Sequence, residues 1–139
     1  MIVVDTNVVS AFMTSAPPPS VLTWLNAQEA ENLYLTTISV AEIRYGLRVM
    51  PEGKRRRLLE ARFQQFIATA FEARILAFDE KAAHQYAEIK GHRRKIGRPM
   101  SDLDGQIAAI ASIRGFAIAT RNVKDFDNCG LNLINPFEP

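Results

Sequence analysis

The chain has 139 residues, with 17 Lys and Arg against 15 Asp and Glu, and Cys129 is its only cysteine. One cysteine excludes an internal disulfide framework and a Cys-rich zinc site. The net charge of +2 permits a polyanionic partner without requiring one. The N-terminus has no basic segment ahead of its apolar residues, and no later apolar run approaches a membrane span. We therefore expect a single cytoplasmic domain over residues 1–139 that can bury a core and has no membrane partner.

Strand-like and helix-like segments alternate along the chain. In chain order, the pattern predicts a strand at Ile2–Val4, a helix from Ser20 to about Ala30, a strand at Leu33–Ile38, a helix capped by Ser39, a helix at Lys54–Phe71, a strand at Ile75–Phe78, a helix capped by Asp79 and fading at Gly97, a helix from Ser101 to Gly115, and strands at Phe116–Thr120 and Leu131–Ile134. Connections too long for hairpins favour parallel strands. The predicted fold class is α/β, with three layers (α/β/α) around a central parallel five-stranded sheet.

Acidic residues recur at one kind of place in this pattern. They are Asp5 at the end of the first strand, Glu42 and Asp104 in the first turns of helices, and Asp125 after the strand near residue 120. Ligands of an open parallel sheet bind outside the carboxyl ends of its strands, so Asp5, Glu42 and Asp104 are expected to converge there. A divalent cation relieves the repulsion between clustered carboxylates. Oxygen ligands without His or Cys favour Mg²⁺ or Mn²⁺ over Zn²⁺.

Helix capping is the alternative explanation for these acids. Glu42 and Asp104 each follow a serine by three residues, which is the spacing of a capping box, and acids in a first turn also favour the helix dipole. Asp5 has no comparable helical role in the predicted pattern, although an Asx-turn is open to it. Asp5 therefore favours the metal interpretation.

Four segments resemble, in order and spacing, the motifs of PIN-domain ribonucleases. They are residues 1–10 (MIVVDTNVVS), 39–46 (SVAEIRYG), 104–109 (DGQIAA) and 119–122 (ATRN). The resemblance covers essentially the whole chain, and its nearest branch is the VapC toxins of bacterial toxin–antitoxin pairs, including the Fit type. It implies a PIN fold and a metal-dependent endoribonuclease.

The resemblance also implies roles for individual residues. The acidic catalytic and metal-binding positions are those of Asp5, Glu42 and Asp104, and Thr6 and Thr120 take supporting positions. The implied cofactor is Mg²⁺, with Mn²⁺ as a substitute. The fourth acid of many relatives aligns near Asn122, an amide without charge, whereas Asp125 lies a turn later. The identity of the fourth ligand, Asn122 or Asp125, stays open, as does the choice between one metal ion and two.

The implied reaction is hydrolysis of an RNA phosphodiester bond, in which a cation binds a non-bridging oxygen and activates the water that attacks in line. The implied protein partner is a cognate antitoxin encoded by a neighbouring gene. Its tail is expected to lie across the acidic crevice and to present an Arg to the carboxylates. A homodimer is also expected. Trp24 and apolar residues of the first two helices are candidates for its interface, although a helix buried against its own sheet shows the same pattern.

Basic residues are concentrated in two clusters, residues 54–57 and residues 93–95 with Arg98. Each cluster is either a contact for the RNA backbone or a solvated face, and Arg94 and Lys95 are the candidate contacts in the second. Arg121 directly follows the strand that carries Thr120, where a guanidinium is expected to reach a phosphate.

Two other functions remain open at this level. Asp79 and Thr120 resemble the phosphoacceptor and the hydroxyl residue of a receiver signalling domain, but the chain has Asp5-Thr6-Asn7 in place of paired acids and Asn135-Pro136 in place of Lys-Pro. The other alternative is a catalytically silent PIN-like binding module.

Overall fold

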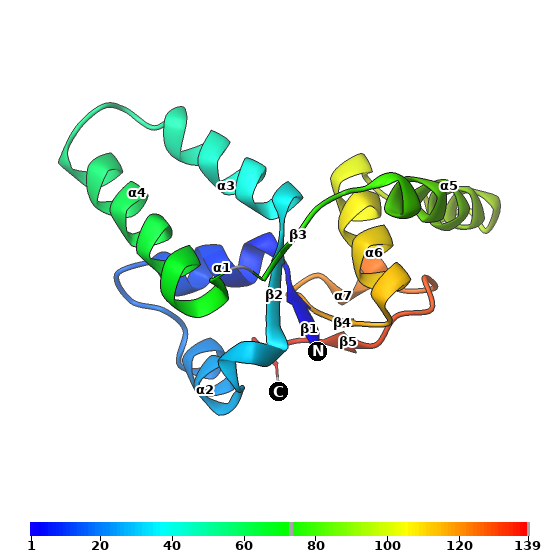
Figure 1. The fold of residues 1–139 in the computed structure, drawn as a ribbon, viewed down its shortest axis with the longest axis horizontal. Helices are drawn as coiled ribbons and strands as arrows, with labels where there is room; N and C mark the ends of the chain where they lie inside the picture. Colours follow the sequence, from blue (N-terminus) through cyan, green and yellow to red (C-terminus); the bar gives the residue numbers. More distant parts are fainter. Residues whose placement is uncertain (73, 139) are drawn as a thin grey trace.

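The central sheet of the computed structural model, which describes residues 1–72 and 74–138, has five strands. The strands are β1 (Ile2–Val4), β2 (Leu33–Thr36), β3 (Ile75–Leu76), β4 (Ala117–Ala119) and β5 (Leu133–Ile134). All neighbours are parallel, in the order β3-β2-β1-β4-β5 (Figure 1). Val3 of the central strand pairs with Tyr34 on one side and with Ile118 on the other. The prediction of a parallel five-stranded sheet is confirmed.

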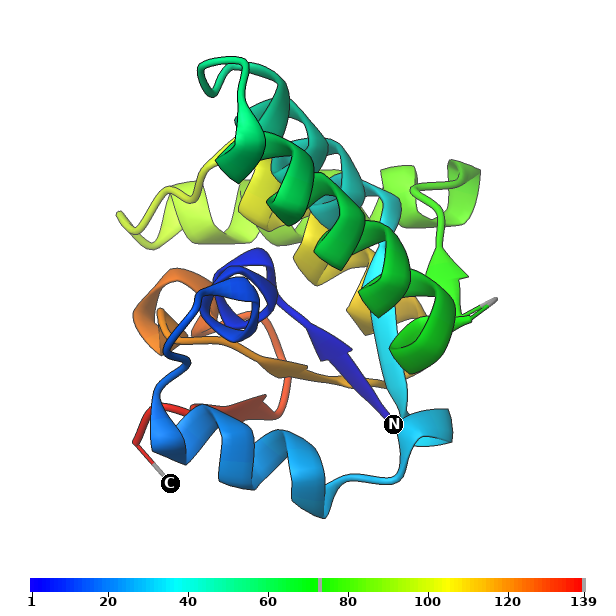
Figure 2. The same cartoon turned by 90° about the vertical axis from the view of Figure 1, so that its left-hand side faces the viewer.

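Helices cover both faces of this sheet. They are α1 (Thr6–Met13), α2 (Pro19–Ala27), α3 (Thr37–Arg48), α4 (Lys54–Phe66), α5 (Glu80–Lys95), α6 (Asp102–Arg114) and α7 (Val123–Phe126), with short turns η1 (Ala30–Asn32) and η2 (Ile67–Phe71). The first four lie on one side of the sheet and the last three on the other (Figures 1 and 2). The three-layer α/β/α architecture is therefore confirmed.

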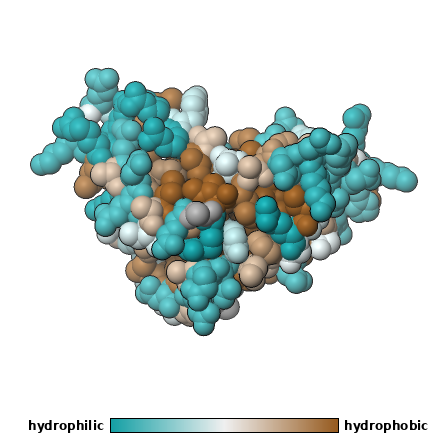
Figure 3. All heavy atoms as spheres, in the orientation of Figure 1, coloured by the Kyte–Doolittle hydropathy of each residue, from teal (hydrophilic) through white to brown (hydrophobic). Residues whose placement is uncertain are grey.

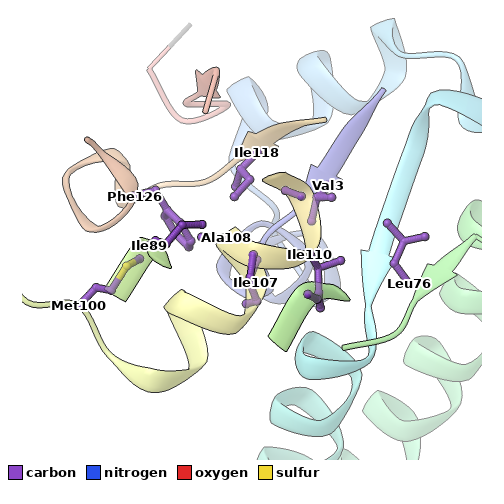
Figure 4. Close-up of a cluster of buried hydrophobic side chains, with 12 residues drawn as sticks. Val3, Leu76, Ile89, Met100, Ile107, Ala108, Ile110, Ile118 and Phe126 are labelled. Atoms are coloured by element: carbon purple, nitrogen blue, oxygen red, sulfur yellow. The ribbon is translucent and has the colours of Figure 1, made fainter. Parts of the chain in front are cut away.

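Two hydrophobic clusters hold these layers together. Because side chains alternate along a strand, Val3 points into one cluster and Val4 into the other. The Val3 cluster packs Ile107 and Ile110 of α6 against the sheet (Figure 4). The Val4 cluster packs helices α1 to α4, with Phe63 of α4 almost completely buried. Continuous β-branched sequence in β1 thus reflects burial of that strand on both faces.

Two predicted helix starts are wrong. Ser20 does not cap α2, which begins one residue earlier at Pro19 and ends at Ala27. Proline suits the first position of a helix because its φ is already helical and its missing N–H is not needed there. Ser39 does not cap α3 either. The cap is Thr36, whose Oγ1 accepts a hydrogen bond from the Ser39 N–H at 3.1 Å. The strand therefore ends at Thr36 rather than at Ile38.

Other helix boundaries agree with the sequence. Asp79 caps α5 by accepting a hydrogen bond from the Ala82 N–H, and Ser101 caps α6 by accepting one from the Asp104 N–H. Gly115 ends α6 in the left-handed conformation, with φ at 69°, which glycine adopts without steric cost. The strands at 75–78, 116–120 and 131–134 are each shorter than predicted, and the last turn of the helix at 54–71 is a π-turn. In residues 1–72 and 74–138, no helix is long and apolar enough to cross a membrane.

Candidate active site

Buried polar side chains gather at the carboxyl edge of the three central strands. Asp5 directly follows β1, Thr36 ends β2, and Thr120 directly follows β4, and all three are buried. A buried polar group is costly unless it has hydrogen-bond partners. The partners that these residues use define the site.

The Asp5 carboxylate is held by donors on both oxygens. Oδ1 accepts from the Thr6 N–H at 2.8 Å, and Oδ2 accepts from Thr120 Oγ1 at 2.8 Å. The Thr120 hydroxyl in turn accepts from the Asn122 N–H at 3.0 Å. Asp5 also occupies the N-cap position of α1, so the expectation that it has no helical role is wrong. The helix begins directly after β1, and this places the carboxylate at the helix N-terminus as well as at the sheet edge.

A second group of hydroxyls links α1 to α3. Thr6 Oγ1 lies 2.9 Å from Glu42 Oε1 and 2.8 Å from Ser39 Oγ. An ionised carboxylate only accepts, so the single Thr6 hydroxyl proton goes to Glu42 and the Ser39 hydroxyl donates to Thr6. Glu42 is consequently held by a side-chain contact from α1, and the Ser39–Glu42 spacing does not act as a capping box.

Charge repulsion and burial act together on Asp5. Burial raises the pKa of Asp5 from 3.8 to about 6, although the hydrogen bonds from Thr120 and Thr6 lower it. The negative charges of Asp104 and Glu42 also contribute to this rise. The three predicted acids therefore lie close enough for Asp5 to respond to the charge of the other two.

Asp104 lies half-buried in the first turn of α6. Burial raises its pKa, the Ser101 hydroxyl lowers it, the charge of Asp125 raises it and the charge of Arg93 lowers it. Asp125 is exposed on α7, and among the three acids its charge acts on Asp104. Asn122 precedes α7 and is exposed. The assignment of either residue as the fourth ligand stays a prediction.

The carboxylate ligands suit a hard divalent cation, but the side chains are not arranged as a preformed metal site. Within residues 1–72 and 74–138, no group of three His, Cys, Asp or Glu is arranged to hold one metal ion. Asp5, Glu42 and Asp104 nevertheless offer only carboxylate oxygens, which Mg²⁺ and Mn²⁺ prefer. A cation would also offset the repulsion that raises the pKa of Asp5. The residues therefore fit such an ion chemically.

The structure separates the basic candidates. Arg94 and Lys95 are exposed at the end of α5, as an RNA contact requires, whereas Arg93 between α5 and α7 is buried. In the first cluster, Arg56 is buried and pairs with Glu60 at 2.9 Å. Arg121 is exposed, but its guanidinium lies over the Phe137 ring, 4.8 Å from the centroid. Neither basic cluster is therefore a simple row of RNA contacts, because each has a structural arginine within it.

Sequence reasoning missed the roles of three residues in this region. Thr36 and Ser39 belong to the hydroxyl network, and Arg93 binds α7 and the residue that follows it, through hydrogen bonds to the carbonyl oxygens of Asp125 and Asp127. A hydroxyl residue at the end of β2, matching Thr120 after β4, was the available signal for Thr36. The same arginine is a basic neighbour of Cys129, since Arg93 Nη1 lies 3.7 Å from its sulfur. Burial nevertheless raises the pKa of this thiol.

The receiver alternative is excluded by topology. Receiver domains use the strand order 2-1-3-4-5, whereas this sheet has the order 3-2-1-4-5. Asp79 consequently follows an edge strand, separated from β1 by β2, and serves as the cap of α5.

Comparison with known proteins identifies the family. The PIN domain family matches residues 2–130. The chain is 43% identical to VapC ribonuclease Y4jK of Sinorhizobium fredii, over 100% of this chain and 99% of the relative. It is 36% identical to toxin FitB of Neisseria gonorrhoeae, over 99% of each chain. The crystal structure of FitAcB from that organism superposes with a TM-score of 0.93 at 36% identity, covering 100% of both chains. The chain belongs to the PIN-domain family, in the branch that contains the VapC and FitB toxins.

The raised pKa of Asp5 predicts how stability depends on pH without a divalent cation. Between about pH 4 and pH 6 the folded chain holds a proton at Asp5 that the unfolded chain has released, so the free energy of unfolding falls as pH rises through this window. The two pKa values correspond to a loss of roughly 3 kcal/mol, complete above about pH 6. Urea unfolding across this range in EDTA measures it. The Asp5→Asn variant is the control and should lack this contribution, and a parent protein that gains stability through the window relative to Asp5→Asn would contradict the site geometry.

Proposed function

We propose that the chain, as a single PIN domain over residues 1–139, is a metal-dependent endoribonuclease that acts as the toxin of a toxin–antitoxin pair. The observation that carries the proposal is the buried Asp5 carboxylate at the sheet edge, fixed by Thr6 and Thr120 and repelled by Asp104 and Glu42. Its relatives named VapC ribonuclease and toxin FitB support the reaction class and the biological role.

Each residue of the site has a part in the proposed hydrolysis. Asp5, Glu42 and Asp104 would hold Mg²⁺ or Mn²⁺ through hard oxygen atoms. When bound, the cation supplies charge neutralisation for the phosphate and lowers the pKa of the attacking water. Thr120 and the Thr6 N–H keep the Asp5 oxygens in place. Glu42, half-buried and held by Thr6, orients the water that attacks phosphorus while the phosphorus–oxygen bond to the leaving nucleotide breaks.

The proposed partners follow from the relatives. FitB is named a toxin, and the structure of FitAB bound to a DNA fragment is similar to this chain, with a TM-score of 0.94 at 36% identity. We propose that a cognate antitoxin from a neighbouring gene covers the acidic crevice and competes with the cation there. A homodimer is also proposed. Trp24 gives little support for it, because this side chain is half-buried against the core of its own domain. The hydrophobic surface at the centre of the face in Figure 3, flanked by hydrophilic ends, is a more suitable location.

Addition of a divalent cation is expected to stabilise the protein and to start cleavage. Millimolar Mg²⁺ or Mn²⁺ should raise the melting temperature, because an ion that binds only the folded state shifts the folding equilibrium. The same ions should permit hydrolysis of a single-stranded RNA, and EDTA should stop it. Differential scanning fluorimetry and gel analysis of labelled RNA measure the two effects. A melting curve that neither cation changes, together with intact RNA, would instead indicate a silent binding module.

A further inference from the structure

A groove of about 560 Å³ lies between α1, α3 and α4, beside the carboxylate cluster. These helices pack against one another on one side of the sheet, where Figures 1 and 2 show α3 and α4 as neighbours. Thr6 and Glu42 belong both to the site and to the lining of this groove. The apolar part of the lining is formed by Met13, Ile43, Leu47, Leu58 and Leu59. The volume is typical of a pocket for a small organic group.

Two arginines that line the groove have no acidic partner. Arg55 and Arg62 take part in none of the ion pairs found among the described residues, 1–72 and 74–138. Arg62 donates one long hydrogen bond, of 3.4 Å, to the Met13 carbonyl oxygen. By contrast, Glu60 on the same helix accepts from Arg56 and lies 3.8 Å from Arg48. The positive charge at the groove is therefore available to an anionic ligand.

We propose that this groove holds an unpaired nucleobase next to the scissile phosphate, while Arg55 and Arg62 bind phosphates of the RNA backbone. The inference rests on the proposed ribonuclease function and deepens it, because it assigns a place on this chain to one base and to neighbouring phosphates of the substrate. An apolar lining with two uncompensated cations matches a ligand that joins a flat base to anionic phosphates. A base within an RNA duplex is paired and stacked, and it cannot enter a groove of this kind.

The position of Glu42 favours RNA over an acidic peptide as the occupant. Glu42 lines the groove and also faces the cluster where the phosphodiester would be hydrolysed, so a strand with its phosphate at the cluster has its next base at the groove. An acidic peptide would satisfy the arginines, but it would meet the negative charge of Glu42 at the same end. RNA brings its phosphates to the cluster where a cation offsets the acids, or where one carboxylate charge is removed, as in Asp104→Asn.

Gly46 on α3 provides a way to fill the groove without disturbing the fold. It lines the groove, and a Cβ atom added there would meet no atom within 4 Å. Alanine and leucine both favour a helix over glycine, so Gly46→Ala and Gly46→Leu should fold. Only leucine occupies the space proposed for the base. Arg57, exposed on α4 and outside the groove lining, is the matched control for Arg55 and Arg62.

The test measures binding of a fluorescein-labelled oligouridylate by fluorescence anisotropy, in an Asp104→Asn background that prevents cleavage. Gly46→Leu should weaken binding roughly tenfold, as expected when one base loses its contacts, and Gly46→Ala should leave it unchanged. The effect of Gly46→Leu should disappear when the strand carries abasic units. Arg55→Gln and Arg62→Gln should each reduce the slope of log Kd against log salt by about 0.7, whereas Arg57→Gln should not.

The proposal is wrong if Gly46→Leu binds the intact strand as the parent does, or if it weakens the intact and the abasic strand equally. It is also wrong if Gly46→Leu affects only an acidic peptide, because the groove would then be a protein docking site. Failure of the ribonuclease function has a different signature, namely a parent protein that does not cleave RNA with Mg²⁺ or Mn²⁺. The binding measurements on the groove do not depend on that outcome.

Discussion

Replacement of Asp5 or Asp104 by Asn should abolish RNA cleavage, with a loss of at least about 100-fold in kcat/KM. The estimate is a lower bound, because loss of a group that merely supports a metal ligand already costs about 10–100-fold. Asparagine keeps the shape of the side chain and removes its charge. Cleavage of labelled RNA at saturating Mg²⁺ and Mn²⁺ measures the effect.

Asp102→Asn is the matched control for Asp104→Asn. Asp102 lies in the same turn of α6 but is exposed and forms an ion pair with Lys90 instead of facing Asp5. Asp102→Asn should retain activity within a few-fold. Measuring the free energy of unfolding of both variants distinguishes a loss of catalysis from a loss of folding. The Ser101 cap of α6 stays in place in both variants. A folded Asp104→Asn protein that cleaves RNA as fast as the parent would remove Asp104 from the site.

The second large effect is expected for Arg93→Ala, which should lower the free energy of unfolding by about 3 kcal/mol or more. The buried Arg93 guanidinium donates to the carbonyl oxygens of Arg98, Asp125 and Asp127, and each hydrogen bond from a charged group contributes about 1.5–3 kcal/mol. These bonds join the end of α5 to the segment that carries Asp125. Urea denaturation of the purified variant measures the loss.

The neighbouring Arg94→Ala variant is the control for Arg93→Ala, because Arg94 is exposed on the same helix. Its effect on stability should stay within about 0.5 kcal/mol, as for most surface substitutions. If Arg94 contacts RNA as predicted, the Arg94→Ala variant should bind RNA more weakly than the parent protein. Equal stability of the two variants would contradict the structural role assigned to Arg93.

The fold was predictable where each segment carried its own signal. The buried strand Ile2–Val4, the Asp79 and Ser101 caps and the Gly115 terminus all follow from local chemistry and agree with the structure. The start of α3 was not predictable in the same way, because Thr36 and Ser39 are both plausible caps. Only the length of β2, fixed by its pairing with β1 and β3, selects Thr36.

The candidate site was predictable as a set of acids but not as a network. Asp5 and Glu42 were indicated by their positions after the strands, whereas the contact between Thr6 and Glu42 depends on how α1 packs against α3. For the basic cluster at residues 93–95, the charges could be predicted from the sequence, but the role of each residue could not. Sequence presents three cations in a row, but helix geometry turns Arg93 inward and leaves Arg94 and Lys95 exposed. Charge patterns alone cannot identify which member is structural.

Anomalous diffraction from crystals soaked in Mn²⁺ determines whether Asp5, Glu42 and Asp104 bind a metal ion together. We expect an anomalous peak bounded by the carboxylates of Asp5, Glu42 and Asp104, which the Asp5→Asn and Asp104→Asn variants should lose. A peak at another location, or full occupancy of this site in both variants, would contradict the assignment of these carboxylates as the metal site.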